Sequence, residues 1–147
     1  MDLRVGAVMR SEPDTISVGE RLAVAVALLA TSNSADLMVI DSDRKFIGVL
    51  SEGDILRYLM PDAVEFRESG LLNSQKLMEG KAADLLDLSI DQFVISSAIV
   101  LAPQDTLIRA AAVMVNMQIR CLPVVEDSFL VGSLSRSRLI HGILTDH

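Results

Sequence analysis

The sequence is poor in residues on which several functions depend. Its 147 residues include no Trp, one Tyr and only 3% aromatic residues, so nucleic-acid bases would find little to stack on. Acidic residues outnumber basic ones by 20 to 13, and the net charge of −7 opposes attraction to nucleic acid or to an anionic membrane surface. We therefore expect neither nucleic acid nor a membrane among its partners.

Residues that carry catalysis or bind metals are also scarce. Cys121 is the only cysteine, and its position in the apolar run CLPVV favours a buried thiol. The two histidines, His141 and His147, have no cysteine or carboxylate at a spacing typical of a metal site. No glycine-rich phosphate loop occurs. The sequence predicts no catalytic residues, no metal and no required cofactor, and we do not expect an enzyme.

Long hydrophobic runs are absent as well. The longest, residues 22–30, is well short of the roughly 20 apolar residues of a membrane-spanning helix. The first ten residues lack the apolar stretch of a secretory signal, so we expect a cytoplasmic protein. Half of the residues are nevertheless hydrophobic (50%), which predicts a folded chain with a substantial core.

The apolar pattern of the chain occurs twice. Residues 16–41 match residues 101–126, which lie 85 positions later. In both segments apolar residues recur at i, i+3, i+4 and i+7, the spacing of one helical face. GVLSEGDIL, residues 48–56, then matches GSLSRSRLI, residues 132–140, at an offset of 84. Each copy is predicted to hold a short strand, a helix, two hairpin-linked strands and a second helix.

The repeat suggests a division of the chain. We assign residues 1–60 to the first copy, residues 81–147 to the second, and residues 61–80 to a partly helical connector of mixed charge. Pro61 marks the boundary because proline ends the preceding helix. A copy of about 60 residues buries too little surface to be stable alone, so the two copies are expected to pack together.

The spacing Ser51-x-x-Asp54 has two compatible interpretations. A serine followed three residues later by a carboxylate is typical of a helix start, and capping alone could account for it. The same helix N-terminus would also attract a phosphate, to which the Ser51 hydroxyl would add a donor. The two oxygens of Asp54 suit a ribose diol, and Gly53 would allow close approach of the sugar.

Four segments together resemble a tandem pair of CBS domains, or Bateman module. They are VMRSEPDTISV, ADLMVIDSDRKFIGVLSEGDIL, VLAPQDTLIRAAAVM and RCLPVVEDSFLVGSLSRSRLI. The resemblance implies an α+β fold of two β-α-β-β-α repeats packed about a pseudo-twofold axis. It also implies a stand-alone regulatory homodimer that binds an adenosine-containing nucleotide, such as AMP, ADP or ATP, between the repeats. Such a module would act as an energy or metabolite sensor, with an unidentified regulated protein as a further partner.

The family's nucleotide signature is complete only in the first copy. Gly48, Ser51 and Asp54 match it, and Gly53 lies within it. By resemblance, the adenine would lie against two short segments of the same copy, Asp14, Thr15 and Ile16 together with Ala35, Asp36 and Leu37.

In the second copy, Ser135 is retained but Arg138 replaces the aspartate, and arginine cannot accept a hydrogen bond from a diol. One hypothesis is a second site in which cations neutralise phosphate; its members are Ser135, Arg136, Arg138 and Arg120, with Ile99 and Val100. An equally plain interpretation makes Arg138 a solvated helix residue. The alternative for the whole chain is a dimerisation or protein-interaction module with vestigial nucleotide pockets.

Overall fold

The computed structural model describes residues 3–32, 36–60 and 63–145, and its element order follows the repeat. The first part contains α1 (Val5–Val8), β1 (Thr15–Ser17), α2 (Leu22–Thr31), β2 (Asp36–Ile40), β3 (Phe46–Ser51) and α3 (Glu52–Leu59). A long helix, α4 (Ala63–Leu85), and a 3₁₀ turn, η1 (Ile90–Gln92), lead to the second part. That part contains α5 (Leu107–Met117), β4 (Cys121–Glu126), β5 (Phe129–Ser135) and α6 (Arg136–Thr145). The predicted α+β fold of two repeats is confirmed.

The two sheets share one pairing scheme. In the first sheet β1 runs parallel to β2, and β2 runs antiparallel to β3. In the second sheet β4 and β5 are antiparallel, and the strand expected near residues 99–101 is reduced to one parallel bridge between Leu101 and Val124. Asp36 lies opposite Ser51 as Cys121 lies opposite Ser135, so the register of the two hairpins is the same.

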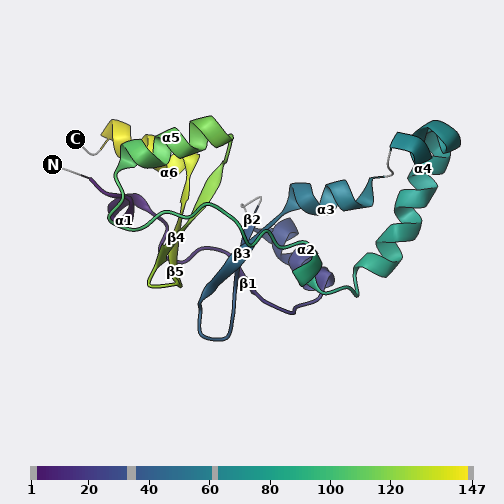
Figure 1. Cartoon of the computed structure of the whole chain (residues 1–147), viewed down its shortest axis with the longest axis horizontal. Helices are drawn as coiled ribbons and strands as arrows, with labels where there is room; N and C mark the ends of the chain where they lie inside the picture. The colour runs from purple at the N-terminus through teal and green to yellow at the C-terminus, as the bar shows by residue number, and fades with distance from the viewer. Residues whose placement is uncertain (1–2, 33–35, 61–62, 146–147) are drawn as a thin grey trace.

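The segment that leads into each repeat packs on the other repeat. Arg10 forms an antiparallel bridge with Ser133 of β5, and Ile95 forms one with Val49 of β3. The cores follow the same exchange. Val5 and Val8 of α1 belong to the core of the second repeat, while Leu85, Ile90 and Phe93 belong to the core of the first. This reciprocal crossing relates the repeats by the pseudo-twofold axis, and Figure 1 shows α1 beside α6.

A third cluster joins the two sheets. Met38 and Ile40 of β2 and Leu130 of β5 are buried together, with Phe46, Val49 and Cys121 packed against them. These side chains lie between the sheets, while the other two cores lie under the helices of each repeat. The repeats therefore share one folded body, as their small size requires.

The connector forms a projecting helix. Helix α4 is interrupted at Gly70, whose φ of 73° is left-handed, and it extends away from the two sheets (Figure 1). It continues past the expected connector end at residue 80, so that Leu85 reaches the core of the first repeat. In the described part of the chain, no helix is long and apolar enough to cross a membrane.

In each repeat, one position must be glycine because the crossing segment passes close to it. A Cβ added at Gly48 would lie 2.6 Å from the carbonyl oxygen of Ile95, and one at Gly132 would lie 2.7 Å from that of Arg10. Both contacts are with backbone atoms of the segment that crosses from the other repeat. The glycine that begins each signature is therefore required for packing, whatever the signature binds.

We predict that Gly48→Ala lowers the free energy of unfolding by roughly 1–3 kcal/mol, because the backbone of Ile95 must move to admit the methyl group. Urea denaturation measures the change. Gly80→Ala is the matched control, since it lies in α4 with nothing within 4 Å of the added Cβ. The control should be neutral or stabilising by up to about 1 kcal/mol. Equal losses in the two variants would contradict the packing requirement.

Candidate functional site

Ser51 joins β3 to α3 and caps the helix. Its Oγ accepts a hydrogen bond from the Asp54 amide at 3.2 Å, and its hydroxyl donates to Asp54 Oδ2 at 2.7 Å. The capping interpretation of Ser51 is confirmed. The other Asp54 oxygen, Oδ1, accepts from Arg57 one helical turn later. Both carboxylate oxygens therefore already have protein partners.

Asp54 retains acceptor capacity. Its side chain is 22% exposed, and a carboxylate offers about four lone-pair positions, of which two are used here. A diol would share the oxygens with Ser51 and Arg57 or replace those contacts. The sequence analysis did not single out Arg57, although its position three residues after Asp54 is the spacing of a helical ion pair.

Carboxylates gather beside Ser51. Burial raises the pKa of the Asp36 carboxyl above its ordinary value; Arg120 opposes this increase, and the negative charges of Glu52 and Asp54 add to it. Arg120 Nη2 also lies 3.8 Å from Glu52 Oε1. The sequence grouped Arg120 with Ser135 and Arg138, whereas the structure pairs it with a residue of the first repeat. Both repeats therefore contribute charged groups here.

Asp14, Thr15 and Ile16 lie on the other edge of β2. Thr15 pairs with Met38 and Ile16 with Val39, so β2 separates them from β3 and Ser51. Asp14 forms an ion pair with Arg10 at 3.3 Å. Burial first, then the charge of Asp36 and, more weakly, that of Asp14 raise the pKa of the Cys121 thiol to about 11.

The other residues expected to contact the nucleotide differ in their exposure. Ile16 and Leu37 are core residues, 4% and 0% exposed, so neither their side chains nor their backbones are open to a ligand. Ala35 lies outside the described residues. Gly53 faces open space, because a Cβ added there would have no neighbour closer than 3.9 Å.

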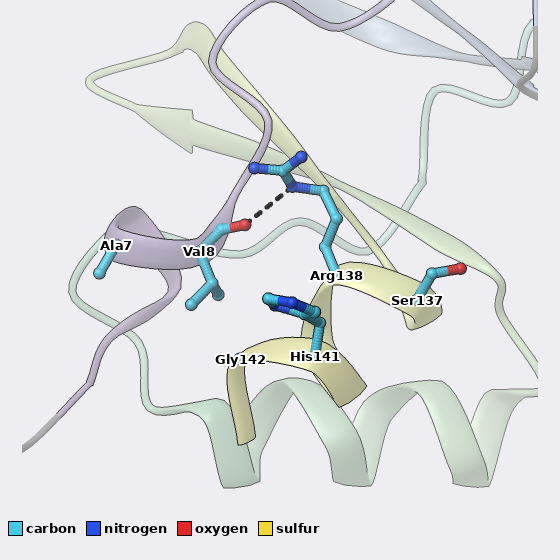
Figure 2. Close-up of a pocket in the computed structure, with 6 residues that line it drawn as sticks. All are labelled: Ala7, Val8, Ser137, Arg138, His141 and Gly142. Atoms are coloured by element: carbon cyan, nitrogen blue, oxygen red, sulfur yellow. Dashed lines mark hydrogen bonds between the residues drawn. The ribbon is translucent and has the colours of Figure 1, made fainter. Parts of the chain in front are cut away.

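The second copy uses its arginine differently. Ser135 Oγ accepts from the Arg138 amide at 3.2 Å, which repeats the cap of the first copy. The Arg138 side chain turns to α1, where Nε donates to the Val8 carbonyl at 2.9 Å (Figure 2). Its Nη2 donates to the Met9 carbonyl at 3.3 Å. Arg138 is thus neither a ribose acceptor nor simply solvated, since it holds the C-terminal end of α1.

The remaining residues of the second group are exposed. The Arg136 amide donates to the Arg120 carbonyl at 3.0 Å, and the Arg136 side chain is exposed. Ile99 and Val100 are 37% and 38% exposed. Among the residues the structure describes, no group of three or more His, Cys, Asp or Glu side chains is arranged to hold a metal ion.

Comparison with known proteins identifies the family. A sequence model of the CBS domain matches residues 5–61 and residues 90–145, which together span more than half of the chain. The protein belongs to the CBS domain family and carries two such domains in tandem, which confirms the predicted Bateman module. CBS-domain proteins are typically regulatory modules rather than catalysts.

Three relatives illustrate the similarity. An uncharacterized protein of Methanocaldococcus jannaschii is 29% identical over 119 residues, which cover 72% of this chain and 71% of that protein. The structure of CBSX2 in complex with AMP has a TM-score of 0.75 at 22% identity, with 98% of each chain covered. A proposed archaeal homologue of g-AMPK from M. jannaschii has a TM-score of 0.79 at 17% identity, covering 97% of this chain and 48% of that one. At 22% and 17% identity, the similarity to the two solved structures shows a shared fold.

We predict that Asp36→Asn raises the free energy of unfolding at pH 7. A pKa raised in the folded state means that the folded protein favours the protonated carboxyl, so ionisation of Asp36 destabilises it as the pH rises through that pKa. The advantage of the variant should shrink as the pH falls through the raised pKa of Asp36 and be lost below the ordinary aspartate value of about 3.9. Urea denaturation from pH 3 to 7 tests this, with Asp127→Asn in the exposed β4–β5 hairpin as control. A gain in the free energy of unfolding that does not change with pH would contradict its assignment to the ionisation of Asp36.

Proposed function

We propose that this protein is a regulatory module that binds an adenosine-containing nucleotide, of the AMP, ADP or ATP kind, at the start of α3. As a sensor of energy state or metabolite level, it would respond to that nucleotide through the packing of its two repeats. The observation that carries the proposal is the convergence of Ser51, Asp54 and Arg120, which brings a capped helix start, a carboxylate and a cation from the other repeat together. The AMP complex of the similar protein CBSX2 supports the choice of ligand.

Each group has a role suited to one part of the nucleotide. The amides at the N-terminus of α3 and the Ser51 hydroxyl would donate to phosphate, and Arg120 would add positive charge in exchange for its contact with Glu52. Asp54 would accept from the ribose hydroxyls in the open space beside Gly53. For the adenine we propose contacts at the start of β2 with Asp36, which is partly exposed, while Leu37 lies buried behind it.

Asp14, Thr15 and Ile16 are the more distant part of the proposed nucleotide site. They lie beyond β2, so their contribution is to support Asp36 and Leu37 rather than to touch the phosphate. The second group of residues around Ser135 and Arg138 is not included in this site, because the Arg138 side chain is bound to α1. The proposal therefore has one nucleotide per chain.

We predict that AMP and adenosine bind the wild-type chain and that Asp54→Asn weakens both by about tenfold or more, because a charged hydrogen-bond acceptor contributes about 1.5–3 kcal/mol. Gly53→Ala should weaken both without loss of stability, since the methyl group fills space that the sugar needs. Arg120→Gln should weaken the binding of AMP and leave the binding of adenosine unchanged, because adenosine has no phosphate. Isothermal titration measures all three, and Gly80→Ala serves as a control.

Two results would contradict the nucleotide proposal. One is an absence of measurable heat with AMP, ADP, ATP and adenosine for the wild-type chain. The other is wild-type affinity in both Asp54→Asn and Gly53→Ala. Either would favour the second candidate, a module for dimerisation or protein interaction.

That second candidate rests on an exposed apolar face on α5 and α6. Ile108 and Val115 of α5 are each 75% exposed, and Ile140 and Leu144 of α6 are 56% and 65% exposed. Between the helices lies an apolar groove lined in part by Met114. Apolar side chains grouped in this way are typical of an interface. We propose that two copies of the chain pair through this face, which is compatible with nucleotide binding.

We predict that the wild-type chain sediments as a dimer and that Val115→Glu converts it to a monomer, because the carboxylate would be buried against apolar side chains. Analytical ultracentrifugation gives the mass. Leu71→Glu is the matched control, since Leu71 is 76% exposed but lies on the projecting helix α4. A monomeric wild type, or dissociation of both variants, would contradict pairing through α5 and α6.

A further inference from the structure

The last helix of each repeat packs against the short helical segment that leads into the other repeat. In the first repeat, Tyr58 of α3 contacts Phe93, which follows η1, with ring centroids 5.0 Å apart and planes at 70°. The repeat offsets make Gly142 of α6 and Val8 of α1 the equivalent residues in the second repeat. An aromatic pair is thus replaced by glycine and valine, and two rings are missing.

A cavity of about 520 Å³ lies at this position. It is lined by Ala7, Val8, Ser137, Arg138, His141 and Gly142 (Figure 2). Val8 packs so closely on α6 that a Cβ at Gly142 would be 2.7 Å from Val8 Cγ1. Val8 and Gly142 therefore form a closely packed apolar wall of the cavity. Its volume is in the range of about 300–1,000 Å³ that is usual for sites of small molecules.

The polar lining of the cavity favours an anion. Arg138 carries a permanent positive charge, and its two hydrogen bonds to the Val8 and Met9 carbonyls fix the side chain without neutralising it. None of the six lining residues is acidic, although the chain as a whole has a net charge of −7. Of the six lining side chains only Arg138 carries a permanent charge, so the local charge of the lining favours an anion.

His141 supplies a second polar group. In Figure 2 its ring extends from α6 toward Val8, beside the Arg138 side chain. Nδ1 lies 3.3 Å from the Thr145 hydroxyl, which leaves Nε2, on the opposite edge of the ring, for a ligand. The cavity therefore combines one permanent cation and one imidazole nitrogen with apolar walls.

We propose that this cavity binds a small aromatic carboxylate. The ring of the ligand lies against Val8, on the side of α6 where the first repeat has the Tyr58–Phe93 pair, and its carboxylate faces His141 and Arg138. A single negative charge matches the single permanent cation. The site is separate from the proposed nucleotide site at Ser51 and Asp54 and does not depend on it.

Benzoate is the probe, titrated into the isotopically labelled full-length chain and followed by amide chemical shifts. Saturable shifts are expected at Ala7, Val8, His141 and Gly142, with none at Ser51 or Asp54. Benzamide has the same ring without the charge and should bind at least about tenfold more weakly, as the loss of a charged hydrogen bond implies. Phenyl phosphate, with more charge than the cavity can neutralise, should bind no more tightly than benzoate.

Two variants and a control locate the site. Ala7→Phe, at an exposed lining position, should fill the cavity and abolish the benzoate shifts. His141→Gln should weaken binding by about tenfold and has no core packing to disturb. Arg136→Gln removes a positive charge from the same helix but does not line the cavity, so it should bind benzoate as the wild type does.

Four outcomes would overturn the proposal. They are benzoate shifts confined to the start of α3, equal binding of benzamide, tighter binding of phenyl phosphate, and equal weakening in His141→Gln and Arg136→Gln. An absence of any saturable shift in the wild-type chain would also overturn it, whatever the variants do.

Discussion

The reciprocal crossing of the two lead-in segments is the constraint on which the structure depends. Each segment adds to the sheet of one repeat before it enters the other, at the bridges of Ile95 with Val49 and of Arg10 with Ser133. The close approach leaves no room for a side chain at Gly48 or Gly132. Neither repeat has a complete core without the other, because the apolar residues of α1, α4 and η1 complete the core of the repeat on which they pack.

The crossing also creates the candidate site. It packs the repeats so closely that Arg120, just before β4, reaches Glu52 at the start of α3. Asp36 and Asp54 are held in the same region, and burial keeps the pKa of Asp36 raised. Partly buried like charges oppose folding, and this is the region where we propose that a nucleotide binds.

The two repeats have diverged on a common backbone. Ser51 and Ser135 make the same cap, but the residue three positions later is an aspartate in one repeat and an arginine in the other. The arginine binds the C-terminal end of α1. Where the first repeat has an aromatic contact, the second has glycine and valine beside a cavity. Equivalent positions thus support different chemistry, because the sheet and the cap fix the backbone while the exposed side of each helix is free to vary.

The sequence by itself determined the repeat, the order of helix, hairpin and helix in each copy, and the helix cap at Ser51, because apolar periodicity and capping depend on neighbours along the chain. The α+β class followed from the resemblance to a known family. The sequence also identified the residues of the first signature. Only the tertiary structure decided that each lead-in packs on the opposite repeat, that Arg120 lies beside Glu52, and that Arg138 turns to α1. These depend on contacts between residues about 45 to 130 positions apart, for which a single sequence carries no local signal.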